Sequence, residues 1–176
     1  VRAALDAGRP HLIELPIAYL AGHDDVLLGA VVCRSADDAG RLHEFRSHTG
    51  VVAAPDPCWL LSRSLRTLPL RMERHTASAT AIAHRLGEHP RVELVRYPGF
   101  SGLLSFDVAD AEAARKVETS LRVIGNATSL GGAHSVLEGR ARWEGDRVPP
   151  GLLRLSVGLE EADELWADLE QALSAA

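Results

Sequence analysis

Apolar and polar positions follow two periods along the chain, a helical one in the middle and an alternating one toward the end. Residues 25–33 form a short, valine-rich apolar run that predicts a strand, and residues 51–54 are a weaker strand candidate. Residues 57–66 and 70–86 are predicted helices. The second helix has one apolar stripe, formed by Met72, Thr76, Ala79, Ile82, Ala83 and Leu86.

The second half of the chain combines strands and helices. Residues 92–97 and 104–108 are predicted strands, and Asp110 is a suitable N-cap for the helix that follows it. Residues 153–157 alternate apolar and polar side chains, and residues 160–172 form a last helix with acidic residues in its first turn. The order is strand, strand, helix, strand, long loop, strand and helix. This order predicts an α/β fold in which the two helices back the sheet.

Composition narrows the class of protein. A chain of 176 residues corresponds to about one domain, and 46% hydrophobic with 24% charged residues is typical of a globular protein. The net charge of −5 gives no basic face for nucleic acid, and no apolar run is long enough for a membrane span. The N-terminus lacks the apolar stretch of a signal peptide. Two isolated cysteines, Cys33 and Cys58, indicate a reducing compartment, so a cytoplasmic location is expected.

Common catalytic and metal-binding motifs are absent from the sequence. Eight histidines are scattered without the converging spacing of a metal site, and the pair His84 and Glu88 is interpreted as an exposed helix pair. No nucleophile elbow, P-loop or dinucleotide fingerprint occurs. The basic residues Arg63, Arg66, Arg71 and Arg74 are interpreted as a solvated helix face. No metal site is predicted.

Arg154 is the one charged residue whose position in a strand demands a partner. The alternation places it between apolar neighbours, where an unpaired guanidinium is costly. One interpretation is an internal ion pair with Glu138, Glu144 or Glu160. The other is a clamp for the carboxylate of a ligand.

Several strings, taken together and in order, resemble the Cys/Met metabolism PLP-dependent enzymes. They are AGHDDVLLG from Ala21, WLLSRSLRTLPLRMER from Trp59, RYPG from Arg96, ATSLGG from Ala127 and LRLSVGLE from Leu153. This trans-sulfuration family includes cystathionine γ-synthases, cystathionine γ-lyases and methionine γ-lyases. The string EGRARWEGDRVP from Glu138 is most similar to lyase-type members, and the whole chain to actinobacterial cystathionine γ-lyase or γ-synthase.

The resemblance covers only the later part of the family pattern and implies a division of the chain. Residues 1–57 would be a remnant of the large PLP-binding domain of a fold-type I, aminotransferase-like enzyme. Residues 58–90 would be connecting helices, and residues 91–176 the small C-terminal α/β domain. The strand in the remnant would lack its neighbours and expose backbone edges. A homo-oligomer or a partner chain carrying the front half is therefore expected.

The resemblance also implies site residues, and one of them has lost its chemistry. The family pattern Ser-Ala-Thr-Lys-Tyr aligns with residues 15–19, so Ala18 stands where a lysine forms the Schiff base with PLP. Leu15 and Ile17 replace two hydroxyls that touch the cofactor phosphate. Alanine has neither a nucleophile nor a titratable group. PLP is thus expected for the family, but no covalent attachment is predicted here, and no catalytic or cofactor-binding residue is assigned.

The substrate side of the family site is better preserved. Arg154 aligns with the arginine that binds the substrate α-carboxylate, and Ser129 lies in the adjacent Ser-Leu-Gly-Gly loop. Three functions follow as hypotheses. The chain is an inactive member of the γ-synthase and γ-lyase family, a component of such an enzyme completed by a partner chain, or a non-enzymatic module that binds amino acids. The substrate itself is not specified by these residues.

Overall fold

The computed structural model describes residues 12–176 of the chain. In chain order its elements are β1 (Leu12–Pro16), α2 (Ile17–Ala21), β2 (Gly29–Cys33), α3 (Ala36–Thr49), α4 (Pro55–Leu65), α5 (Leu68–Glu88), β3 (Leu94–Arg96), β4 (Leu103–Asp107), α6 (Ala111–Ser120), β5 (Gly125–Asn126), β6 (Val136–Gly139), α7 (Ala141–Glu144), a 3₁₀ turn (Gly145–Arg147), β7 (Leu152–Ser156) and α8 (Ala162–Ser174). None of the helices in this part of the chain is long and apolar enough to cross a membrane.

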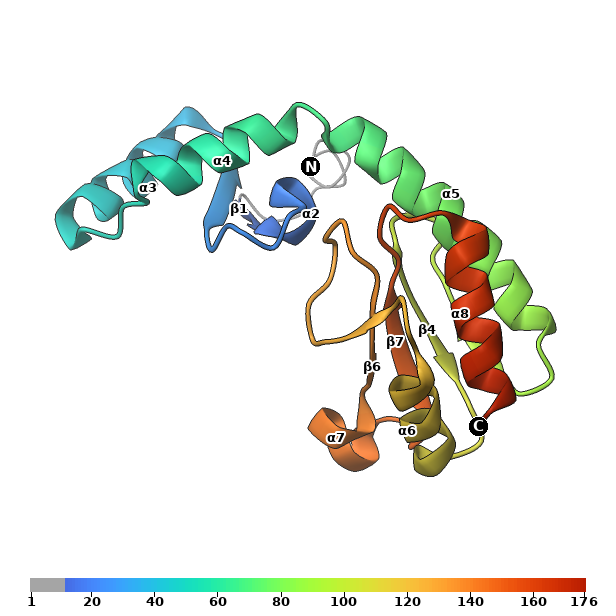
Figure 1. Ribbon diagram of the computed structural model, residues 1–176. Helices are drawn as coiled ribbons and strands as arrows, with labels where there is room; N and C mark the ends of the chain where they lie inside the picture. Colours follow the sequence, from blue (N-terminus) through green and yellow to red (C-terminus); the bar gives the residue numbers. More distant parts are fainter. Residues whose placement is uncertain (1–11) are drawn as a thin grey trace.

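The second half of the chain forms one sheet with helices on one face, which confirms the predicted α/β fold. The strand order is β3-β4-β7-β6-β5, and only the β5–β6 pair is parallel. Helices α5, α6 and α8 cover one face of this sheet (Figure 1). The core between the layers contains Phe106, Leu137, Leu153 and Leu155 from the strands and Ile82, Val117, Leu165 and Leu169 from the helices. The alternate residues of β7 and β6, including Arg154 and Glu138, therefore lie on the opposite face.

The predicted cap of α6 is confirmed at the level of atoms. Asp110 has extended backbone, and its carboxylate accepts a hydrogen bond of 2.8 Å from the backbone N–H of Ala113. This bond satisfies one of the four N–H groups that a helix leaves open at its start. The second backing helix, predicted over residues 160–172, is α8.

Two predictions in the first half of the chain were wrong. Residues 51–54 form no strand: Val51 and Val52 are 70% and 63% exposed and no neighbouring strand pairs with them. The strand predicted over residues 25–33 is confined to β2, because the residues before it form a loop. β2 pairs antiparallel with β1, and no further strand within residues 12–176 joins this pair.

Helix α3 was not predicted, because it buries none of its residues and so has no apolar stripe. Local capping defines its ends instead. Ser35 accepts a hydrogen bond from the backbone N–H of Asp38, and Gly50 closes the helix with φ of 71°, a conformation that favours glycine.

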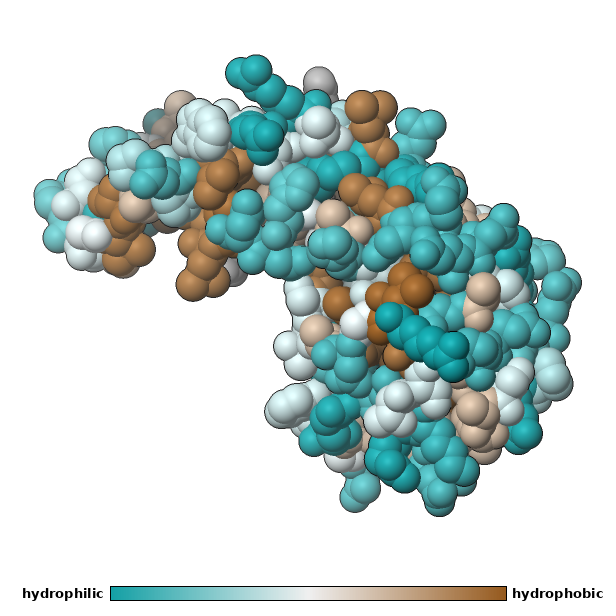
Figure 2. All heavy atoms as spheres, viewed as in Figure 1, coloured by the Kyte–Doolittle hydropathy of each residue, from teal (hydrophilic) through white to brown (hydrophobic). Residues whose placement is uncertain are grey.

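The segment from β1 to α4, residues 12–65, is here called the arm. Apart from α2 and the turn after it, the arm extends away from the five-stranded sheet, and α5 leads from it along the helical layer (Figure 1). Large exposed apolar side chains are concentrated on the arm and the start of α5: Leu27, Val31, Phe45, Val51, Val52, Trp59, Leu65 and Leu70. Figure 2 shows brown, hydrophobic patches on the visible face of this part of the molecule. An isolated two-stranded sheet is only marginally stable in water, so the arm lacks a core of its own.

Candidate functional site

Ala18 lies in the first turn of α2, directly after β1. Its side chain lines an open pocket of about 470 Å³. The other lining residues are Ala21, Asp24, Asp25, Val26, Leu27 and Leu28. The pocket beside position 18 thus offers apolar surface and two carboxylates. The side chains of Leu15 and Ile17 lie outside the described residues.

The position of α2 is fixed by a buried arginine from α5. Arg71 is 6% exposed, so its interpretation as part of a solvated face was wrong. Its Nη1 donates to the carbonyl of Tyr19 at 2.7 Å, and its Nη2 donates to the carbonyls of Leu20 and Ser64 at 3.1 and 3.0 Å. Its Nε donates to the hydroxyl of Thr67 at 3.2 Å. Because these acceptors are neutral, burial lowers the pKa of Arg71 from its ordinary value.

Tyr19, the neighbour of Ala18, connects α2 to the five-stranded sheet. Its hydroxyl accepts a hydrogen bond from the N–H of Gly102, and its ring meets that of His75 edge-on at 5.3 Å. His75 is fully buried, and its Nδ1 donates to the carbonyl of Val157 at 2.7 Å. Its Nε2 is buried without a hydrogen-bond partner among the described residues. Burial lowers the pKa of His75, which makes it a neutral packing residue.

Ser129 and the segment after α2 are joined by hydrogen bonds. The hydroxyl of Ser129 donates to Oδ1 of Asp24 at 2.7 Å, and the N–H of Ala133 donates to the carbonyl of Gly22 at 2.9 Å. Asp24 has φ of 55°, a conformation uncommon for a residue other than glycine. A side chain at Gly132 would collide with the Asp24 carboxylate, so the loop fits closely around it.

Arg154 contacts the same loop from the sheet, so the structure brings the two predicted binding residues together. Its Nη2 forms an ion pair with Oε1 of Glu138 and donates to the carbonyls of Thr128 and Ser129, at 2.6 and 3.4 Å. Of the three internal carboxylates considered for Arg154, the partner is Glu138. Among the described side chains, those of residues 18–176, none accepts a hydrogen bond from Nε or Nη1 of Arg154. The side chain is 20% exposed.

Glu138 is the centre of a buried network that sequence reasoning had not identified as such. Its side chain is 2% exposed, and its Oε1 also accepts from Nη1 of Arg140 at 2.6 Å. Its Oε2 accepts from the indole N–H of Trp143 at 3.1 Å. Hydrogen bonds that Arg140 donates to Glu144 and Glu138 raise the pKa of Arg140. One buried carboxylate therefore orients two guanidinium groups.

The described residues do not fit a covalently held PLP. Ala18 has no amine, and the carboxylates of Asp24 and Asp25 in the adjacent pocket would repel a phosphate group. The only lysine of the chain, Lys116, lies on α6, where its amine is 3.5 Å from the carboxylate of Glu112. Helices α6 and α2 lie in different parts of the molecule (Figure 1).

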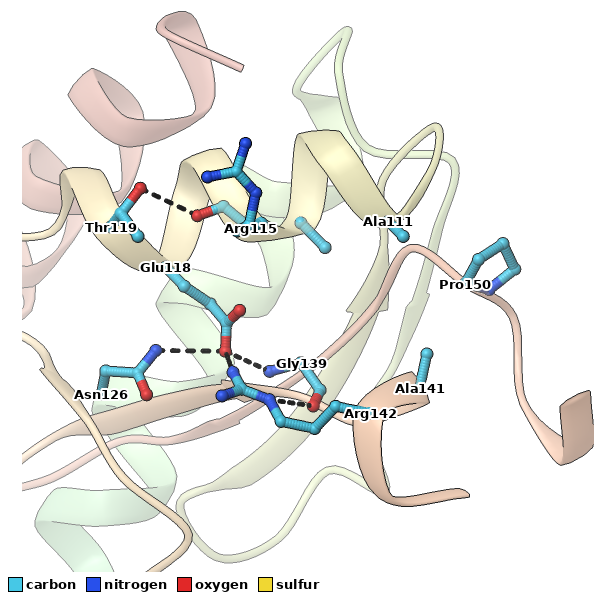
Figure 3. Close-up of a pocket in the computed structure, with 10 residues that line it drawn as sticks. Ala111, Arg115, Glu118, Thr119, Asn126, Gly139, Ala141, Arg142 and Pro150 are labelled. Carbon is cyan, nitrogen blue, oxygen red and sulfur yellow. Dashed lines mark hydrogen bonds and ion pairs between the residues drawn. The ribbon is translucent and has the colours of Figure 1, made fainter. Parts of the chain in front are cut away.

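A second pocket, of about 680 Å³, lies between α6, β5 and α7 and is not lined by Ala18, Ser129 or Arg154. Figure 3 shows the carboxylate of Glu118 at its centre. Oε1 of Glu118 accepts from the N–H of Gly139 at 2.6 Å, from the amide of Asn126 at 3.1 Å and from Arg142. None of the predicted site residues lies here. Among the side chains of residues 18–176, which the structure describes, no three from His, Cys, Asp or Glu gather as a metal site requires.

Comparison with known proteins identifies one family. The sequence model of the family described as Cys/Met metabolism PLP-dependent enzyme matches residues 17–174. The chain is 37% identical to a cystathionine gamma-synthase of Haemophilus influenzae, over 97% of this chain and 49% of the relative. It is 36% identical to an L-methionine gamma-lyase of Pseudomonas deceptionensis, over 97% of this chain and 50% of the relative.

Solved structures agree with the sequence matches. The crystal structure of metB from Corynebacterium glutamicum superposes with a TM-score of 0.91 and 34% identity, over 97% of this chain and 50% of that chain. The chain thus spans about half the length of the curated relatives and the solved structure that it matches.

Proposed function

The chain belongs to the Cys/Met metabolism PLP-dependent enzyme family, and from this premise we propose that this chain, which spans about half the length of its relatives, does not catalyse by itself. The observation that carries the proposal is Ala18. In the family this position supplies the amine that holds the cofactor. PLP provides the electron sink for reactions at the α-carbon of amino acids, and a protein amine is needed to attach it and to relay the proton.

Two features of the chain support this proposal. Lys116, the only lysine, belongs to α6 and is paired with Glu112. The pocket beside Ala18 is lined by Asp24 and Asp25, whose carboxylates would repel the phosphate of a cofactor bound there. The free cysteines Cys33 and Cys58 support a cytoplasmic location, because that compartment keeps thiols reduced.

The first test is cofactor retention. The purified chain, incubated with pyridoxal phosphate and dialysed, is expected to lose all cofactor absorbance, because no amine stands at position 18 to hold it. The absorption spectrum after dialysis measures this directly. Lys116→Arg is the matched control, since it removes the only lysine and any adventitious label on it. Absorbance that survives dialysis in both proteins contradicts the proposal.

A second candidate function is that of a component completed by a partner chain, favoured by the arm. Phe45 and Trp59 are both 63% exposed there, and exposed apolar patches commonly mark interaction sites. The partner that we propose is a chain carrying the front half of the family fold, since this chain spans about half the length of the relatives it matches.

Association with such a front-half chain is the test of this candidate. Phe45→Ser is expected to weaken binding of a front half taken from a relative by about tenfold or more, because large anchors dominate interface energy. The dissociation constant is measured by titration. Phe100→Ser is the matched control, since Phe100 is equally exposed, at 61%, but lies outside the arm. Equal effects of both changes, or no association at all, would exclude this candidate.

A further inference from the structure

The carboxylate of Glu118 lies at the centre of the pocket between α6, β5 and α7, and only one of its two oxygens is used. The side chain is 8% exposed, and Oε1 accepts hydrogen bonds from Gly139, Asn126 and Arg142. In the described part of the chain no donor bonds to Oε2, and in Figure 3 every dashed line to Glu118 ends on the other oxygen. A nearly buried carboxylate oxygen thus keeps its lone pairs free.

Arg142 brings free donors to the same pocket. Its Nη2 forms the ion pair with Glu118, and its Nε donates to the carbonyl of Gly139 at 3.4 Å. Nη1 carries two N–H groups, and no acceptor among the described residues bonds to them. The side chain is 46% exposed, so a ligand can reach these groups. The pocket therefore offers a free acceptor and a free donor that belong to one ion pair.

The rest of the pocket wall contains small apolar residues. Ala111 and Ala114 come from α6, Ala141 from α7 and Pro150 from the segment before β7. Figure 3 shows Ala111 on the helix above the pocket and Ala141 on the α7 side. Because these side chains are small, they leave a space of about 680 Å³, which is enough for a ligand with a ring-sized apolar body.

The charges of the ion pair select the class of ligand. A carboxylate could accept from Arg142 but would be repelled by Glu118, and an ammonium group could donate to Glu118 but would be repelled by Arg142. A primary carboxamide avoids both repulsions, because it is neutral and places two N–H donors beside a carbonyl acceptor. The side chain of Arg115 also lines the pocket, but Figure 3 shows it directed away from Glu118.

We propose that this pocket binds a neutral ligand in which a primary carboxamide is attached to a small apolar body. The amide N–H donates to Oε2 of Glu118, and the amide carbonyl accepts from Nη1 of Arg142. The apolar body packs against Ala111, Ala141 and Pro150. Hydrogen bonds to charged groups are stronger than those between neutral groups, so the ion pair provides both affinity and selectivity.

The experiment compares three probes that share one ring. Benzamide carries the neutral amide, benzoate only acceptors, and benzylamine only a charged donor. Dissociation constants are measured by heteronuclear NMR titration, in which the N–H of Gly139 and the side-chain amide of Asn126 report from the site because both bond to Glu118. The wild-type chain is expected to bind benzamide about tenfold more tightly than either charged probe.

Glu118→Gln reverses the free group without changing the shape of the side chain. The glutamine carbonyl can keep the three donors of Oε1, and its NH₂ group then replaces the acceptor Oε2 with a donor. Benzamide is expected to bind about tenfold more weakly and benzoate about tenfold more tightly. Glu112→Gln is the matched control, because Glu112 is on the same helix, is 68% exposed and does not line the pocket. Its effect is expected to be less than about twofold.

Ala141→Leu tests the pocket by its volume instead of its charge. A larger side chain on the α7 wall occupies the space of the ligand body and leaves the ion pair between Glu118 and Arg142 in place. All three probes are expected to bind about tenfold more weakly. Thermal unfolding of each variant checks that it is folded, and this variant keeps the test decisive if Glu118→Gln is unstable.

Three outcomes would overturn the inference. Benzoate binding as tight as benzamide binding in the wild-type chain would make this an anion site of Arg115 and Arg142. An unchanged benzamide affinity in Glu118→Gln would exclude Oε2 as the acceptor. No shift of the Gly139 and Asn126 signals at millimolar benzamide would remove the site. None of these measurements involves pyridoxal phosphate or position 18, so this inference and the proposed function fail separately.

Discussion

Asp168→Ala is expected to lower the free energy of unfolding by about 2–4 kcal/mol, because three backbone N–H donors, of which that of Ile124 is buried, lose their acceptor. Asp168 on α8 is 5% exposed, and its carboxylate accepts from the backbone N–H groups of Arg122, Val123 and Ile124 at 2.9, 2.8 and 2.9 Å. These donors follow α6, so the carboxylate joins the two backing helices. Against a total stability of about 5–15 kcal/mol, the loss is large. Urea unfolding followed by circular dichroism measures it.

The control for this prediction lies on the same helix. The carboxylate of Asp163 is 85% exposed and forms an ion pair with Arg85 at 2.6 Å. Exposed ion pairs contribute about 0–1 kcal/mol, so Asp163→Ala is expected to have little effect. If the two variants lost equal stability, the backbone-capping role given to Asp168 would be wrong.

Glu138→Gln is expected to lower the free energy of unfolding by about 3 kcal/mol. The change leaves Arg140 and Arg154 without the buried charge that both face, and breaking a buried ion pair on one side costs about 3–5 kcal/mol. We expect the lower end of that range, because the two arginines are 22% and 20% exposed and water partly solvates them. The measurement is again urea unfolding at neutral pH.

Glu144→Gln separates the effect of burial from that of charge. Among the described residues Glu144 forms an ion pair only with Arg140, at 2.6 Å, and its side chain is 34% exposed. Its loss is expected to cost about 1 kcal/mol or less. A loss in Glu144→Gln as large as that in Glu138→Gln would contradict the central place of Glu138 in the network.

Elements with a buried face or a clear cap could be predicted from the sequence. β4 and β7 alternate because one face of the sheet meets the helices, and Asp110 marks the start of α6 by its side-chain chemistry. Helix α3 could not be found by periodicity, since it packs no apolar stripe against the rest of the chain. The local signals at its ends, Ser35 and Gly50, would have found it.

The apolar stripe predicted for helix α5 was partly misplaced. Ala79, Ile82 and Leu86 are buried as predicted, but the buried face continues through Ser78, His75 and Arg71. Arg71 and His75 lie eight and four residues before Ala79, so helical spacing places them on the buried face. Their polarity argued against burial. The carbonyls of α2 and Val157 that satisfy them are distant in sequence, so no local pattern reveals them.

The contacts of the candidate site, too, could be predicted from the sequence only in part. A partner for Arg154 was expected, but the choice of Glu138 depends on the register of β6 against β7, which one sequence does not specify. The contact between Ser129 and Asp24 joins residues more than 100 positions apart. Such contacts depend on how α2 and the turn after it pack against the five-stranded sheet. No local sequence pattern predicts that packing.

The docking of α2 also bears on how such a chain can persist in evolution. Arg71 holds the carbonyls of Tyr19 and Leu20, and the Tyr19 hydroxyl holds Gly102, whereas the side chain of residue 18 takes part in none of these bonds. A mutation that removed an amine at position 18 would therefore leave folding intact and escape quality control. Purifying selection on stability and purifying selection on catalysis act on different residues of the same helix. An intact fold therefore shows that selection on stability has acted, and it gives no information about selection on catalysis.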